Sequence, residues 1–432
     1  MRRIQRIWLV LTGAALAAPM SGRAAAESFD SGFYTRGIET ANYMDQGGAV
    51  FDPYYVPVKT GALLPRVTLA VTHEDNVFLE PEDGTAATSI NLDAGLLALW
   101  GRPGDNHLYA DYGLGLPLYN SEDAVSDRPS HLLRLGAVYH TPRSQINAQA
   151  GFRHLEDLDT VVGARVVKQD YFGDLNGEYR ISGKSSVGLV GRAERHEYDA
   201  EDYVDYDRYY GGGRLYHRLT PKSEGFVQAG LGRDEPQEPA DSASGADFHD
   251  LALGVRGKQS PKFSSIGRVG YMWRNYDDEL RGNFEHWTAS LEARSCPFGL
   301  TTFTGELYAD VRPAADETGY DTVDQGVVGS ASRRLFFERL RGNASVTLGR
   351  IDYRGGPDAT VSSDSTSPIY NGRSDDYWGF TLGLDWWTKQ HCSLGLAYSY
   401  MQRDGSREAD AEMQQATSYE YGRWTFRASW NY

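Results

Sequence analysis

The last ten residues place the tightest limit on what this chain can fold into. Apolar side chains at Trp424, Phe426, Ala428, Trp430 and Tyr432 alternate with polar ones at Arg423, Thr425, Arg427, Ser429 and Asn431. Successive side chains of a β-strand point to opposite faces, so one face here is aromatic and the other hydrophilic. The length matches the roughly 9–11 residues that cross a bilayer once as a tilted strand. A half-buried strand of a soluble sheet is the alternative, but it would rarely end a chain on a fully aromatic face.

The same ending carries a targeting pattern. Its aromatic face (Trp424, Phe426, Trp430 and the terminal Tyr432) resembles the C-terminal signal read by the barrel assembly machinery of outer membranes. We therefore expect these four residues to act as the assembly signal and that machinery to be a partner.

The N-terminus predicts export from the cytoplasm. Three arginines within the first six residues precede a short apolar stretch over 7–18, and Ala24, Ala25 and Ala26 precede Glu27. Basic residues, a short apolar stretch and small residues in this order are typical of a secretory signal peptide. The apolar stretch is too short to cross a membrane as a helix.

Cleavage there divides the chain into three expected parts: a signal peptide (1–26), a periplasmic or lumenal N-terminal extension (27–61) and an outer-membrane β-barrel (62–432). The signal holds four Arg and no acid, so its removal lowers the formal charge from −16 to −20. An acidic balance argues against a nucleic-acid partner, which requires basic patches.

Only Cys296 and Cys392 are present, and whether they pair stays open because two cysteines define no disulfide framework.

Alternating segments recur from Arg66 onward. The apolar positions of the first five segments run over 67–71, 90–100, 108–116, 133–139 and 146–152, and thirteen more segments lie near 171–181, 187–198, 208–218, 225–233, 249–257, 263–275, 285–295, 301–312, 323–334, 340–352, 377–387, 392–402 and 420–432. The total is even, as single-chain bacterial barrels require. We predict an all-β fold, a transmembrane antiparallel β-barrel of about 18 strands. The segments 208–218 and 323–334 are the least regular, and without them the count falls to 16.

The connections between these segments alternate between short and long. Short ones contain Pro or Gly in tight turns, as in Thr141-Pro142-Arg143-Ser144 and Ser260-Pro261-Lys262, whereas long ones such as 354–375 are rich in Asp, Ser and Gly. Short periplasmic turns opposite long extracellular loops are typical of outer-membrane barrels. A β-propeller also repeats at a fixed period, but its blades need four short strands where each repeat here has room for two long ones.

Two features together resemble the beta-barrel porin 2 family of outer-membrane proteins. One is the opening strand from Leu64 to Leu69 followed by His73-Glu74-Asp75-Asn76-Val77-Phe78, and the other is the repeated Ser/Thr-Pro-Lys/Arg hairpin with Gly-Arg-Val-Gly-Tyr over 267–271. His73 and Glu74 replace the Tyr-Asp usual in that family. The resemblance covers most of 60–432 and implies a barrel associated with exopolysaccharide production, acting in polysaccharide export or as a porin.

Residues between the apolar ones would line the lumen. In this register they include the arginines Arg134, Arg153, Arg180, Arg192, Arg256, Arg268, Arg294, Arg312, Arg341, Arg423 and Arg427, with Arg274 and Arg403 in addition. Guanidinium groups bind carboxylates in bidentate fashion, and rings of Arg in a narrow pore favour anions. These arginines are therefore candidate contacts for an anionic glycan. They could equally pair with acids on the same face, such as Asp111, Glu178 and Asp385, as a structural ladder.

Aromatic residues have two candidate roles. Those near strand ends (Trp100, Tyr139, Trp273, Trp287, Trp378, Trp386 and Trp424) fit an interfacial girdle. Inward ones (Tyr109, Tyr308, Tyr377 and Trp387) could instead stack on sugar rings.

Catalytic and metal motifs are sparse. The ten His are scattered, and the sequence holds no Gly-x-Ser-x-Gly, no His-Glu-x-x-His and no zinc-type spacing. His196 beside Glu194 and Glu197 is the best acid–base candidate, and a salt bridge explains it as well. We expect no enzyme, no cofactor and no metal site.

The predicted function is an outer-membrane channel for a polysaccharide, in the export of an anionic exopolysaccharide, or for charged small solutes. A surface enzyme or a non-conducting structural barrel is the alternative. Expected partners are outer-membrane lipid and lipopolysaccharide, polysaccharide, and periplasmic export proteins.

Overall fold

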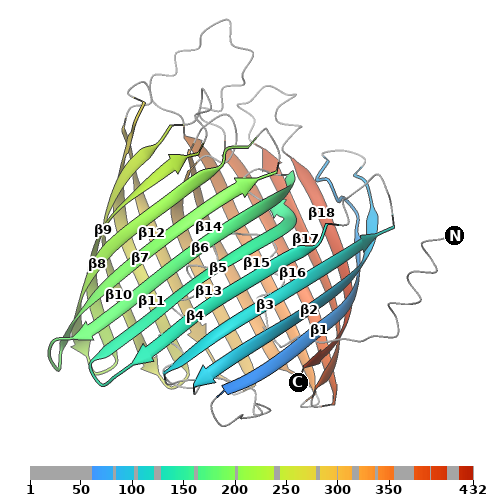
Figure 1. Ribbon diagram of the computed structural model, residues 1–432, viewed down its shortest axis with the longest axis horizontal. Coiled ribbons are helices and arrows are strands. Elements are labelled where there is room, and N and C mark those ends of the chain that lie inside the picture. The colour runs from blue at the N-terminus through green and yellow to red at the C-terminus, as the bar shows by residue number, and fades with distance from the viewer. Residues whose placement is uncertain are drawn as a thin grey trace, which may run out of the picture.

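A closed ring of 18 antiparallel strands makes up the fold (Figure 1). The computed structural model describes residues 61–80, 84–101, 106–120, 128–159, 164–199, 203–237, 244–278, 283–298, 300–313, 321–335, 339–354, 374–389, 391–405 and 418–431. The signal peptide, nearly all of the extension and Tyr432 lie outside these ranges. Within them, no helix has the length and apolar character needed to cross a membrane.

The strands are β1 (Gly61–Glu74), β2 (Ala87–Gly101), β3 (His107–Tyr119), β4 (Ser130–His140), β5 (Ser144–Asp159), β6 (Ala164–Arg180), β7 (Ser185–Tyr198), β8 (Tyr206–Thr220), β9 (Ser223–Pro236), β10 (Ala246–Ser260), β11 (Phe263–Tyr276), β12 (Asn283–Ser295), β13 (Thr301–Arg312), β14 (Asp321–Arg334), β15 (Leu340–Arg354), β16 (Ser374–Lys389), β17 (Cys392–Gly405) and β18 (Tyr419–Asn431). Each pairs with its neighbours in sequence. The ring closes where β1 pairs with β18, from Arg66 opposite Asn431 to Glu74 opposite Arg423.

The predicted fold class is confirmed, and the count is 18 rather than 16. The two least regular segments form β8 and β14. Short turns gather at one end of the barrel, the lower end in Figure 1, and the longer connections at the other. We call these the short-turn end and the long-loop end.

The outer face is apolar along the strands. Leu189 is 68% exposed, Leu231 is 64% exposed and Leu253 is 61% exposed, because each lies on the side that no other part of the described chain covers. Their neighbours in sequence point to the interior. Apolar side chains exposed around a whole closed ring indicate that lipid, rather than water, surrounds the wall.

Placing a charge in this belt is expected to impair the barrel. Leu189→Arg should cost about 2–4 kcal/mol if the side chain sits near the bilayer midplane, and less toward the interfaces. Unfolding in lipid vesicles and heat-modifiable migration on gels would measure the loss. Val190→Arg is the matched control because Val190 faces inward. An equal loss in both variants would contradict the assignment of the faces.

Candidate functional site

Some ion pairs of the interior wall skip strands. Arg256 on β10 reaches Glu178 on β6 at 2.7 Å, and Arg66 on β1 reaches Asp111 on β3 at 2.5 Å. A contact that passes over an intervening strand must cross the concave side of a closed sheet. These residues therefore face the lumen, as the alternation of the sequence requires.

Most of the predicted lumen arginines are held by acids. The ion pairs are Arg134–Asp111 (2.8 Å), Arg153–Asp170, Arg192–Asp174 (3.1 Å), Arg256–Glu178 (2.7 Å), Arg256–Glu224 (2.8 Å), Arg312–Asp324 (2.6 Å) and Arg427–Asp385 (2.7 Å). Arg341 and Arg423 also have interaction partners. These ion pairs form the structural ladder that the sequence analysis gave as the alternative role of the arginines. In each pair, the acid largely neutralises the charge of the guanidinium group.

Three of the predicted arginines stand apart. Arg268 donates to the Ser290 hydroxyl at 3.3 Å, and Arg180 donates to the carbonyl of Pro142 at 3.4 Å. Neither forms an ion pair with another described residue, and Arg294 has no polar partner in that part of the chain. These three guanidinium groups keep an unneutralised charge on the inner face.

Arg274 and Arg403 differ from the expectation that they line open lumen, because each is only 1% exposed. Arg403 pairs with Asp375 at 2.5 Å and donates to the Tyr353 hydroxyl at 2.6 Å. Arg274 pairs with Asp234 at 2.5 Å and also with Asp321. Both networks lie toward the long-loop end.

The β13–β14 end leaves the wall and enters the lumen. Pairing between β12 and β13 runs only from Ala289 opposite Ala309 to Ser295 opposite Phe303, so the described residues beyond this point are unpaired across that seam. Val311 and Val323 share the face of the lipid-exposed Leu307, yet both are fully buried. They pack on Phe248 and Met272 from the inner faces of β10 and β11. We call residues 310–313 and 321–324 the tucked end.

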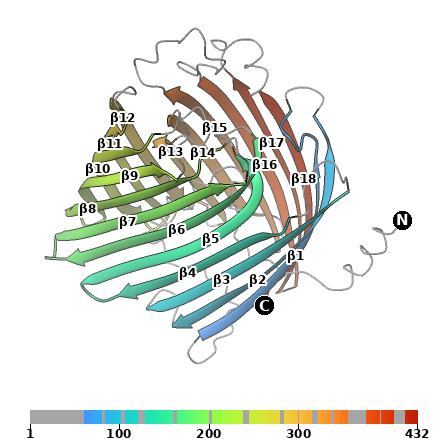
Figure 2. The same cartoon turned by 45° about the horizontal axis from the view of Figure 1, so that its top comes forward.

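A second hairpin end bends inward at β5 and β6. Figure 2 shows the end of β5 curving over the interior of the ring. Arg165, at the start of β6, donates to the carbonyl of Val77 and to Glu74, both at 3.0 Å, and to the Tyr119 hydroxyl at 3.3 Å. These contacts join β6 to the chain that leaves β1, five strands away.

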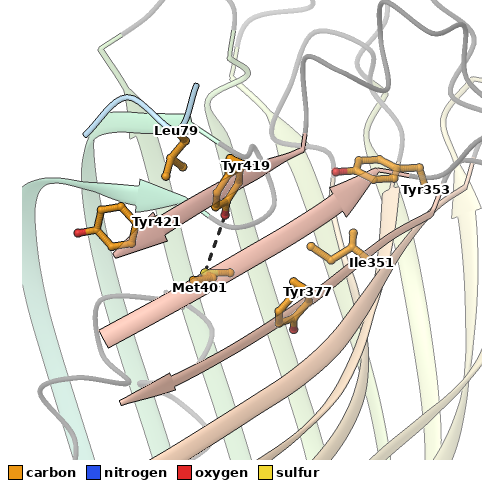
Figure 3. Packing of buried hydrophobic residues seen from close by; sticks show 7 residues of the cluster. All are labelled: Leu79, Ile351, Tyr353, Tyr377, Met401, Tyr419 and Tyr421. Atoms are coloured by element: carbon orange, nitrogen blue, oxygen red, sulfur yellow. Dashed lines mark hydrogen bonds between the residues drawn. The ribbon is translucent and has the colours of Figure 1, made fainter. Parts of the chain in front are cut away.

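The segment after β1 also turns into the barrel. Asp75 and Gly422 exchange two hydrogen bonds, and the Asn76 amide donates to the carbonyl of Glu420 at 2.9 Å. Leu79 has a left-handed backbone conformation (φ 61°), which is strained for a branched residue. Its side chain belongs to a cluster of buried residues from β15 to β18 and lies beside Tyr419 (Figure 3), and this burial compensates for the strain.

Aromatic side chains lie against glycines of adjacent strands on the inner face. The pairs are Tyr109–Gly136, Phe172–Gly151, Tyr216–Gly188, Tyr210–Gly230, Phe226–Gly254, Phe248–Gly232, Tyr308–Gly326 and Tyr377–Gly349. A Cβ on Gly136 would lie 2.3 Å from the Tyr109 ring, so only glycine leaves room. The guanidinium of Arg256 then covers Tyr216 from the lumen side at 3.9 Å. Of the predicted inward aromatics, Tyr109, Tyr308 and Tyr377 belong to this set.

Two other candidates are placed by the structure. His196 pairs with Asp170 at 2.7 Å and stacks on Tyr206, which is a structural arrangement. Cys296 and Cys392 are both free. No three His, Cys, Asp or Glu side chains of the described ranges gather to hold a metal ion.

Outward aromatic residues mark both edges of the apolar belt. Trp100, Tyr139 and Trp386 lie toward the short-turn end, and Trp273, Trp287, Trp378 and Trp424 lie toward the long-loop end; all are exposed. An even-stranded antiparallel barrel with an apolar exterior and aromatic girdles has the architecture of bacterial outer-membrane proteins. The protein is an outer-membrane barrel. Trp424, Phe426 and Trp430 of the predicted assembly signal lie on its outward face.

Comparison with known proteins places the barrel among distant structural neighbours. OpdO of Pseudomonas aeruginosa is 11% identical with a TM-score of 0.46, covering 87% of this chain and 98% of that one. OccK2 (OpdF) of the same species, crystallised with glucuronate, is 12% identical with the same coverages and TM-score. A bacterial polysaccharide outer membrane secretin is 11% identical with a TM-score of 0.34, covering 85% and 98%. The likeness concerns the barrel fold alone. No family model and no curated protein matches the chain, so the resemblance to the beta-barrel porin 2 family stays a prediction.

Sequence reasoning missed the three inward elements. The sequence analysis includes the Glu74-Asp75-Asn76 stretch in the family resemblance, but its position against β18 depends on which strands close the ring. The tucked end keeps the same alternation as the wall, so nothing in its sequence separates it from an ordinary strand end.

Proposed function

We propose that the barrel is a channel for charged small solutes, with small anionic saccharides as the favoured class. The observation that supports this most directly is a lumen face lined by arginines and acids, on which Arg180, Arg268 and Arg294 keep free charge. Charged groups fixed around a water-filled passage select ions by sign. The inward elements at the long-loop end narrow the passage, which favours small solutes over a polymer in this conformation.

Export of an anionic exopolysaccharide is the second proposal. The inner aromatic rings support it because flat rings on a pore wall can stack on sugars, as Tyr109 would. It requires the inward elements to move aside during transport. Polymer left in the periplasm after deletion of the gene would favour export, whereas slower uptake of one acidic solute would favour the first proposal. Lipopolysaccharide, the assembly machinery and periplasmic export proteins remain proposed partners.

Conductance in planar bilayers tests the channel. We expect ohmic single-channel currents and a reversal potential shifted toward anions. The double variant Arg268→Ser/Arg294→Ser should move the reversal potential toward cations, because it removes two unneutralised charges. Arg427→Ser/Asp385→Ser is the matched control, since it removes one paired charge of each sign and leaves the net charge of the lumen face unchanged. Absence of any current from correctly folded protein would contradict the channel proposal.

A further inference from the structure

We propose that the tucked end is a gate that moves between its position in the lumen and a second position in the wall, where it completes the pairing of β12 with β13. This inference rests on the proposed channel function and assigns its regulation to a named element. In the second position the element leaves the lumen and widens the passage at the long-loop end.

The first support is the interrupted seam. If the register of Ala289 opposite Ala309 continued, Trp287 would lie opposite Val311 and His286 opposite Arg312. Instead the edge of β12 over 283–288 has no strand partner on that side among the described residues, although its other edge pairs fully with β11. Backbone N–H and C=O groups on such an edge form a template for another strand. The segment with the correct register to fill it is the tucked end itself.

The second support is that the side chains suit both positions. Val311 and Val323 alternate in step with Phe303, Leu307 and Val327, all of which are exposed to lipid. In the wall, Val311 would therefore point outward beside Trp287, within the aromatic girdle. In the lumen, the same apolar faces are buried on Phe248 and Met272. Each position buries these faces away from water, so neither leaves an apolar surface unpaired.

The third support is that an ion pair and hydrogen bonds stabilise the tucked end in the lumen position. Asp321 pairs with Arg274, and Arg208 donates to the carbonyl of Val311 at 3.4 Å. On the opposite face, the Tyr377 hydroxyl donates to Asp324 at 2.9 Å; β16 lies two strands from β14, so this contact passes over β15 and is not specific to the lumen position. The contacts with Arg274 on β11 and Arg208 on β8 would break if the end returned to the wall. Two arrangements with different sets of contacts are the requirement for a two-state switch.

Cysteine cross-linking tests the second position. In a Cys296→Ser/Cys392→Ser background, Trp287→Cys/Val311→Cys should form a disulfide under mild oxidation in native outer membranes. In the lumen position this bond is excluded, because Trp287 is 63% exposed on the outer face whereas Val311 is fully buried inside. The matched control is Leu291→Cys/Leu307→Cys, an outward pair that is directly opposed in the structure. The cross-linked gate variant should conduct several times more than its reduced form.

The outcomes separate the gate from the channel. Rapid disulfide formation between Cys at 291 and 307, with no disulfide between Cys at 287 and 311, would overturn the gate. A 287/311 bond that leaves an existing conductance unchanged would also overturn it. A 287/311 bond in a protein that never conducts would support the movement and contradict the channel proposal instead. Phe248→Cys/Val323→Cys joined by a short bismaleimide should hold the lumen position and keep the conductance low. A conductance in this cross-linked protein as high as that of the disulfide-linked Trp287→Cys/Val311→Cys variant would count against the gate.

Discussion

Replacing Asp375 by alanine is expected to destabilise the barrel by about 3–5 kcal/mol, because it leaves the buried Arg403 guanidinium without its counter-charge. Both side chains of this ion pair are 0% exposed, and their closest approach is 2.5 Å. The Tyr353 hydroxyl accepts from Arg403 but cannot neutralise its charge. The free energy of unfolding in urea, measured in lipid vesicles, would report the loss.

Asp376 supplies the control from the next position of β16. Its side chain is 69% exposed and lies 3.8 Å from Arg350, itself 48% exposed. Exposed pairs contribute roughly 0–1 kcal/mol, so Asp376→Ala should unfold nearly as the parent does. Equal losses for the two variants would show that the buried pair contributes no more than a surface one, contrary to its burial.

Replacing Arg165 by alanine is expected to raise the single-channel conductance severalfold. This side chain joins the β5–β6 end to the segment after β1 through Glu74, Val77 and Tyr119. Without it, two of the three inward elements lose the contact that holds them together over the lumen. Planar-bilayer recording would show larger and noisier open currents, and larger sugars should enter in liposome swelling.

Arg128→Ala is the control for this experiment. Arg128 pairs with Asp199 outside the strands, and both side chains are about half exposed. Its loss should leave conductance unchanged. A parent-like conductance in Arg165→Ala, from a barrel of normal stability, would mean that the inward elements do not depend on this contact or do not limit the current.

The sequence predicts the wall of this barrel well and its interior less well. A two-residue alternation ending in Trp424, Phe426 and Trp430 determines which face meets lipid, since an exposed arginine on that face would be costly. Turn residues such as Pro142 mark where strands reverse. Local pattern is sufficient for these features because each depends on neighbours a few positions apart.

The interior depends on partners distant in sequence. That Arg165 reaches Glu74, or that Arg274 joins Asp234 to Asp321, follows from how the ring curves and where its seam opens. The same alternation suits Val311 to lipid and to the lumen, so pattern alone cannot distinguish these positions. The sequence could predict that arginines face inward, but not which of them the acids neutralise.

The rings that lie over glycines restrict how this chain can change over evolutionary time. At Gly136, a methyl group would lie 2.3 Å from the Tyr109 ring on the next strand, so alanine is tolerated only if that aromatic residue becomes smaller in the same lineage. The aromatic and glycine residues of each pair should therefore covary among homologues of this protein, although they lie on different strands. A set of diverged homologues that kept the aromatic residue while freely replacing its glycine would show that the wall can bulge to accommodate the added atoms.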